Sequence, residues 1–132
     1  MCETSIYISA FNLHSAIYIG GVFNSVDYAI IRVKGSIFQK NTAQEGGVVS
    51  AAFTSAFFSN CSFDSNEAES GGVVSLELSQ CEVLNSEFLF NNATRGGVFY
   101  LKSESALNTT YYNFFSNKVI SVLIKVNNKS LL

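Results

Sequence analysis

The stretch Phe38-Gln39-Lys40-Asn41, followed five residues later by Gly46-Gly47-Val48, decides the fold because the chain repeats it. The pattern returns as Phe63-Asp64-Ser65-Asn66 with Gly71-Gly72-Val73, and as Phe88-Leu89-Phe90-Asn91 with Gly96-Gly97-Val98. A later Phe114-Phe115-Ser116-Asn117 lacks the glycines, and an early Gly20-Gly21-Val22 lacks the Phe-x-x-Asn. Successive units are 25 or 26 residues apart, and self-similarity at a period of about 20–50 residues is typical of stacked repeats.

The composition indicates a folded, strand-rich domain with little charge. Among 132 residues, 48% are hydrophobic and only 14% are charged, with a net charge of −2, no proline, twelve Phe and six Tyr. Aromatic and β-branched residues favour strands. The acidic and basic residues are scattered singly, so no basic stripe is present to follow a nucleic-acid backbone. No apolar run approaches the ~20 residues of a transmembrane helix, so we expect no transmembrane segment in this chain.

The three cysteines predict neither a disulfide framework nor a metal site. Cys2, Cys61 and Cys81 are an odd number without C-x-x-C spacing, which argues against paired disulfides and against zinc. We expect Cys61 and Cys81 to be small, partly buried thiols. No cofactor or metal is predicted.

Each repeat is interpreted as two short strands separated by turns. In the second unit, residues 48–53 and 56–63 are the predicted strands. The pair Gly46-Gly47 permits a bend with positive φ. The polar residues 64–70 are predicted to be a turn, in which Asn66 takes a left-handed or Asx-turn conformation. The segments are too short and too rich in β-branched and aromatic residues for a helical repeat.

These features predict an all-β fold, a right-handed parallel β-helix (solenoid) of about four rungs of 25–26 residues plus partial terminal rungs. Equivalent residues would then stack ~4.8 Å apart in columns. We predict that residues 1–132 form one β-helix segment, in which 1–19 is a degenerate rung or cap, 20–121 the regular rungs, and 122–132 a terminal strand and tail. We expect a fragment of a longer repeat protein, which continues into further rungs or pairs at its ends. The predicted columns are Phe38, Phe63, Phe88, Phe114; Val22, Val48, Val73, Val98; Ala43, Ala68, Ala93, Val119; and Asn41, Asn66, Asn91, Asn117.

The pairing of Phe-x-x-Asn with a glycine pair resembles the repeats of chlamydial polymorphic outer-membrane proteins. More broadly, it is similar to the β-helix of the pectin-lyase-like group, which also occurs in protist surface proteins. The resemblance covers roughly residues 20–122 and implies an extracellular or cell-surface location. Two features differ: Val follows the glycine pair where that family usually has Ala, and no membrane barrel is present in this chain.

The residues needed for polysaccharide cleavage are not gathered by the repeat. The only aspartates, Asp27 and Asp64, fall at different repeat positions, and the single His14 precedes the first clear rung. Arg32-Val33-Lys34 matches an Arg-x-Lys spacing, but no acidic residue accompanies it at that register in its own or the next rung. We interpret it as a solvated face. Calcium sites in repeat proteins recur in successive rungs, and the acidic residues of this chain do not. We therefore interpret these residues as hydrated: Glu67, Glu69, Glu82 and Glu87.

Four N-glycosylation sequons are present, at Asn60, Asn92, Asn108 and Asn128, and they favour a eukaryotic secretory route. The sequence as a whole predicts a non-catalytic extracellular module that is a scaffold or an adhesin for a protein or a glycan. The alternative is a polysaccharide lyase or glycoside hydrolase of the pectin-lyase-like fold.

Overall fold

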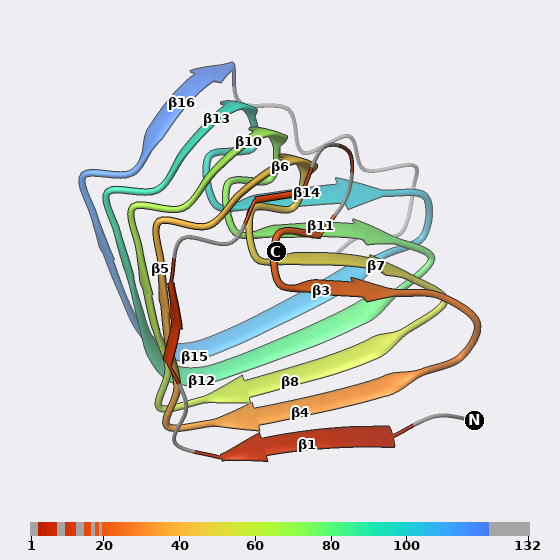
Figure 1. The fold of residues 1–132 in the computed structure, drawn as a ribbon. Helices are drawn as coiled ribbons and strands as arrows, with labels where there is room; N and C mark the ends of the chain where they lie inside the picture. Colours follow the sequence, from red (N-terminus) through yellow and green to blue (C-terminus); the bar gives the residue numbers. More distant parts are fainter. Residues whose placement is uncertain (1–2, 8–9, 13–14, 17, 19, 122–132) are drawn as a thin grey trace.

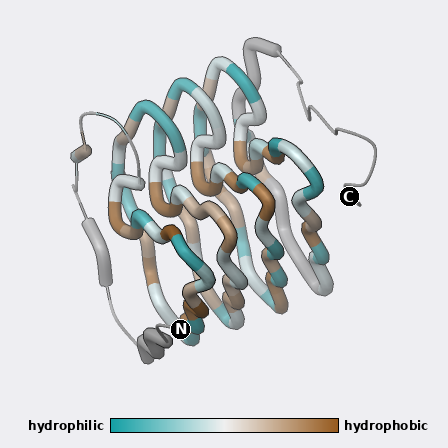
Figure 2. The backbone as a smooth tube through the Cα atoms, turned by 90° about the vertical axis from the view of Figure 1, so that its right-hand side faces the viewer, coloured by the Kyte–Doolittle hydropathy of each residue, from teal (hydrophilic) through white to brown (hydrophobic). Residues whose placement is uncertain are grey.

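The computed structural model describes residues 3–7, 10–12, 15, 16, 18 and 20–121, and the structural statements below concern these residues. They form an all-β solenoid in which every paired strand is parallel to its neighbour (Figure 1). The chain runs clockwise in Figure 1 while it recedes from the viewer, and Figure 2 shows the coil advancing from the N-terminal side to the C-terminal side. The predicted fold class, a right-handed parallel β-helix, is therefore confirmed.

Three parallel sheets form the walls of the coil. The largest, sheet A, makes the floor in Figure 1 and bends upward along one side, whereas sheet B rises from that side and sheet C lies above the floor. Sheet A contains β1 (Glu3–Tyr7), β4 (Ile30–Lys34), β8 (Ser55–Ser59), β12 (Gln80–Leu89), β15 (Ala106–Phe115), β9 (Ser62–Asp64), β5 (Ile37–Gln39) and β2 (Ala10–Asn12). Sheet B contains β6 (Thr42–Glu45), β10 (Glu67–Ser70), β13 (Asn92–Arg95) and β16 (Lys118–Ser121), and sheet C contains β3 (Phe23–Ser25), β7 (Val49–Ala52), β11 (Val74–Glu77) and β14 (Phe99–Lys102).

The core is built from columns of aligned side chains, one from each rung, and in some columns the residue type is the same in successive rungs. The Phe38 and Phe63 rings are stacked with centroids 5.0 Å apart, and Phe63 and Phe88 are stacked at 4.9 Å. Phe58 packs edge-on against this stack, 5.4 Å from Phe63. Aromatic pairs in such geometries contribute ~0.5–1.5 kcal/mol each beyond their buried area. Phe114, the next member, pairs through its backbone with Phe88.

The polar segment 64–70 differs from its prediction. It was expected to be a turn, but Glu67–Ser70 forms strand β10 and pairs with β6 and β13. Only Ala68 and Ser70 of this strand are buried, so the segment lacks the apolar alternation that identifies a strand from sequence. Its backbone hydrogen bonds come from the neighbouring rungs, and this pairing outweighs the local preference for a turn.

Each rung bends at four corners, which hold residues with positive φ, and one of these corners holds two of them, Asp27 and Tyr28. The prediction placed this conformation at Asn66, but Ser65 adopts it, with φ of 56°. The predicted strand 56–63 is interrupted in the same way by Asn60, with φ of 53°. The four corner columns are Gly20, Gly46, Gly71, Gly96; Tyr28, Phe53, Leu78, Ser103; Gly35, Asn60, Asn85; and Lys40, Ser65, Phe90, Ser116.

No helix long and apolar enough to cross a membrane occurs in the described part of the chain.

Candidate ligand-binding groove

The predicted asparagine column forms a continuous hydrogen-bonded amide ladder. Nδ2 of Asn41 donates to Oδ1 of Asn66, and Nδ2 of Asn66 donates to Oδ1 of Asn91, both at 3.0 Å. Asn91 donates in the same way to Asn117 at 2.9 Å. Each amide thus links its rung to the next, so this column is architectural.

The glycine pairs allow close approach between rungs. Gly71 has φ of 65°, and a Cβ on Gly72 would lie 2.2 Å from the backbone oxygen of Gly97. A Cβ on Gly47 would lie equally close, 2.2 Å from the backbone oxygen of Gly72. The column Val48, Val73 and Val98 that follows the glycines is buried. Gly46, Gly47, Gly71, Gly72, Gly96 and Gly97 therefore shape the corner between sheets B and C.

Two further polar columns escaped the sequence analysis. In the first, the Ser86 hydroxyl donates to the backbone oxygen of Leu84 at 2.9 Å and accepts the N–H of Cys61 at 3.0 Å. In the second, Ser79 donates to the backbone oxygen of Glu77 at 2.7 Å and accepts the N–H of Thr54 at 3.0 Å. The repeat period is the feature of the sequence that could have revealed them. The first column contains Ser36, Cys61 and Ser86, and the second contains Thr54, Ser79 and Ser105.

The outer face of sheet A carries the candidate site, a groove of about 240 Å³ across β4, β8 and β12. Register places Arg32 beside Phe57 and Phe57 beside Glu82, whereas Lys34 lies in the next row beside Ser59. Both basic residues are exposed because alternate residues of β4 point away from the core. The groove is lined by Arg32, Lys34, Phe57, Ser59, Glu82 and Leu84, together with Val33 and Phe58.

The groove combines an aromatic surface with charged groups. The guanidinium carbon of Arg32 lies 4.6 Å from the centroid of the Phe57 ring, within cation–π distance. Phe57 points outward from β8 and is not part of the core, and its side chain is half-buried. Two cations and one carboxylate, Glu82, line the groove. This arrangement can hold a ligand that has both an apolar face and an anionic group.

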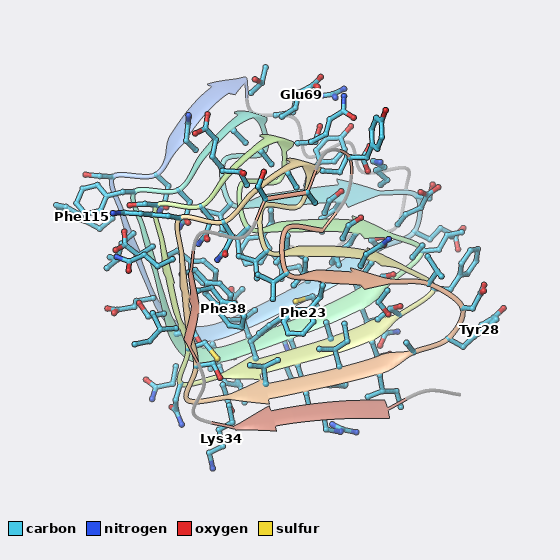
Figure 3. All side chains as sticks on the ribbon, viewed as in Figure 1. Phe23, Tyr28, Lys34, Phe38, Glu69 and Phe115 are labelled. Carbon is cyan, nitrogen blue, oxygen red and sulfur yellow. The ribbon has the colours of Figure 1, made fainter. Side chains whose placement is uncertain are left out.

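Carboxylate–cation pairs lie elsewhere, near the junction of sheets B and C. The Glu45 carboxylate is 2.8 Å from the Lys102 ammonium, and Glu69 is 3.2 Å from the Arg95 guanidinium. Both cations lie 5.6 Å from the centroid of the Tyr100 ring. In each pair the two charges neutralise one another. Figure 3 shows Glu69 at the upper edge of the molecule, above sheet C.

The remaining acidic residues do not converge on a metal site. Asp64 is aligned with Gln39 and Leu89, so no column of carboxylates forms. Asp64 instead accepts a hydrogen bond from the Gln39 amide at 3.0 Å, and Glu87 accepts one from the Ser62 hydroxyl at 3.1 Å. Across the described residues, no group of three or more His, Cys, Asp or Glu side chains is placed to bind a metal ion. His14 lies outside the described residues.

Both cysteines of the described region are free and buried. Burial raises the pKa of the Cys61 thiol, and it raises the pKa of Cys81 to about 12, with a smaller contribution from the charge of Glu82. Such thiols are protonated and poor nucleophiles at neutral pH. Cys61 occupies a position that serine holds in the neighbouring rungs.

The sequons differ in accessibility. Asn60 is exposed at a corner, where its amide oxygen accepts a hydrogen bond from Asn85 at 2.6 Å. Asn108 is exposed on the outer face of sheet A, in the row of Glu82. Asn92 is half-buried in β13, and Asn128 lies outside the described residues.

No protein-family profile matches this chain, and no curated protein or solved structure resembles it significantly.

Proposed function

We propose that this chain is a non-catalytic binding module of an extracellular or cell-surface β-solenoid, and that its ligand is a glycan with an anionic group. The observation that carries this proposal is the contact between the Arg32 guanidinium and the Phe57 ring inside the groove. A sugar ring presents apolar C–H groups to an aromatic side chain and hydroxyl groups to polar neighbours. Arg32 and Lys34 supply the cations that an attached carboxylate or sulfate requires.

The solenoid supports this proposal because it holds the groove on paired strands. Arg32, Phe57 and Glu82 lie on three hydrogen-bonded neighbours, so their spacing is set by backbone pairing. A site on regular strands is held more rigidly than one on loops. The resemblance of the repeat to those of chlamydial polymorphic outer-membrane proteins and protist surface proteins also favours a role at the cell surface. The exposed sequons at Asn60 and Asn108 are compatible with that location.

Binding to a panel of neutral, carboxylated and sulfated oligosaccharides, followed by calorimetry, tests this proposal. Phe57→Thr and Arg32→Gln are each expected to weaken binding at least about tenfold, which corresponds to ~1.4 kcal/mol. Asn108→Ala alters the same row beyond the residues that line the groove and is the matched control. Equal binding by all four proteins, or a preference for neutral sugars, would refute the site.

Enzyme assays separate the proposal from its alternative. The wild-type protein is expected to leave uronate polymers and neutral polysaccharides intact. Release of reducing ends, or of unsaturated products that absorb in the ultraviolet, would show that the chain is a hydrolase or a lyase and would contradict the non-catalytic proposal.

A further inference from the structure

An exposed apolar ridge runs along the corner between sheet C and the floor strands of sheet A. We define the ridge as Val26, Tyr28, Phe53 and Leu78, which are 55%, 69%, 43% and 39% exposed. Tyr28 and Phe53 come from successive rungs, and their ring centroids are 5.8 Å apart with a tilt of 40°. Figure 3 shows Tyr28 at the outer edge of the molecule, opposite Phe115. Clustered exposed aromatic side chains of this kind mark interaction sites.

The fold does not require these side chains. Tyr28, Phe53 and Leu78 have φ of 61°, 52° and 47°, a conformation that costs a residue with a side chain ~1–2 kcal/mol. At the corner between sheets B and C of the same rungs, glycine adopts this conformation, at Gly46 and Gly71. The ridge residues are also absent from the core cluster. Neither backbone geometry nor core packing therefore explains three bulky apolar residues in this column.

The surroundings of the ridge are acidic. Asp27, Glu77 and Glu104 are all exposed. Within the described part of the chain, none of the three forms an ion pair. Lys102 is the register neighbour of Glu77, but its ammonium lies 2.8 Å from the Glu45 carboxylate. The ridge therefore combines aromatic faces with carboxylates whose charge is not neutralised by a neighbour.

We propose that the ridge docks an extended segment of a partner protein that presents both Arg or Lys and apolar side chains on the face toward the ridge. Cations bind aromatic faces within ~6 Å of the ring centroid, and the flanking carboxylates add charge complementarity. Apolar side chains of the segment would cover Val26 and Leu78. A second copy of this chain fits less well, since pairing two ridges would bring their carboxylates together. An anionic glycan is also disfavoured, because the carboxylates beside the ridge would repel it. The ridge and the groove are therefore expected to bind different ligands.

Fluorescence anisotropy with a labelled peptide of repeated Arg-Ser-Leu-Ser, which places Arg and Leu on one face of an extended chain, tests this proposal, and the corresponding Glu-Ser-Leu-Ser peptide is the charge control. Tyr28→Asn combined with Phe53→Asn is expected to weaken binding of the basic peptide at least about tenfold. Asp27→Asn combined with Glu77→Gln is expected to weaken it similarly and to reduce its salt dependence. Asparagine tolerates positive φ, so the folded state of these variants is expected to persist and is checked by thermal unfolding.

Phe90→Asn is the matched control, because Phe90 is an exposed aromatic residue with φ of 53° at a different corner. It is expected to change binding less than about twofold. The proposal is overturned if Phe90→Asn weakens binding as strongly as the ridge variants, or if the acidic peptide binds equally well. It is also overturned if sedimentation without peptide shows a dimer that Phe53→Asn dissociates, since the occupant would then be a second copy.

Discussion

Oδ1 of Asn91 accepts two hydrogen bonds from Asn66, one from the side-chain amide at 3.0 Å and one from the backbone N–H at 2.9 Å. The second amide hydrogen of Asn66 goes to the backbone oxygen of Phe38 at 3.0 Å. Asn66 in turn accepts two hydrogen bonds from Asn41. All four hydrogen-bonding positions of this buried amide are therefore occupied, and one side chain joins three successive rungs.

Replacing Asn66 is expected to destabilise the solenoid strongly. Asn66→Ala would leave the backbone N–H of Asn41 and the backbone oxygen of Phe38 buried without their partners. Each such group costs ~1–3 kcal/mol, so we expect the free energy of unfolding to fall by about 3–5 kcal/mol. Urea denaturation followed by circular dichroism measures the change. Asn108→Ala, at an exposed position, is expected to change stability by less than about 0.5 kcal/mol, and an equal effect of both would contradict this role.

Glycine substitutions at two corners are expected to have opposite outcomes. Gly72→Ala would place a Cβ 2.2 Å from the backbone oxygen of Gly97. Because backbone atoms of stacked rungs cannot easily move apart, we expect a loss of several kcal/mol, at least about 3. Gly35→Asn is expected to be tolerated, since Asn60 and Asn85 occupy the same column with φ of 53° and 47°. Thermal unfolding of both variants tests the pair. A stable Gly72→Ala protein would show that the rungs are not as closely packed at this corner.

The parts of the fold that were predictable from sequence are those in which one residue type recurs at the period. Stacked Phe38 and Phe63 and the buried Val48 followed from this repetition. Strand β10 did not, because its pairing partners lie in other rungs and its exposed residues are acidic. The strand at this position is therefore determined by pairing with equivalent strands of the neighbouring rungs and not by the local preference of its own residues.

The groove and the ridge were harder to predict because their residues vary from rung to rung. Arg32, Phe57 and Glu82 share a row at the repeat spacing, yet nothing in their identities marks a common site until the register is known. The left-handed conformation of Phe53 runs against the preference of bulky side chains, so turn chemistry could not locate that corner. Variable positions in equivalent rungs are thus the part of the chain where function has to be sought.

The thiol of Cys61 substitutes for a hydroxyl in a column of serines, which leads to a third prediction. Its sulfur lies 3.3 Å from the backbone oxygen of Ser59, whereas the Ser86 hydroxyl makes the equivalent bond at 2.9 Å. Cys61→Ser is expected to change the free energy of unfolding by less than about 1 kcal/mol, because a hydroxyl can donate to the backbone oxygen of Ser59 as Ser86 does to that of Leu84. Ser86→Ala is expected to cost ~1–3 kcal/mol, since it leaves the N–H of Cys61 without its acceptor. The urea midpoints of the two variants measure this difference in stability. A Cys61→Ser variant less stable than Ser86→Ala would show that apolar burial dominates at this corner.

The buried thiol of Cys81 predicts an alkaline loss of stability. Burial raises its pKa from an ordinary value of 9.0 to about 12. Between these values the unfolded chain releases the proton while the folded chain retains it, so the folded state binds more protons and its stability falls as pH rises. Urea midpoints at successive pH values above neutrality measure this slope.

Cys81→Ala is the matched variant for this measurement, because Ala56 occupies the same column of the core. It is expected to be less stable at neutral pH, where a smaller side chain leaves unfilled space. Its stability should nevertheless decline less steeply with rising pH than that of the wild type, because one linked proton has been removed. Tyrosine and lysine titrations are common to both proteins and cancel in the comparison. Identical slopes would mean that the Cys81 thiol ionises as easily in the folded chain as in the unfolded one.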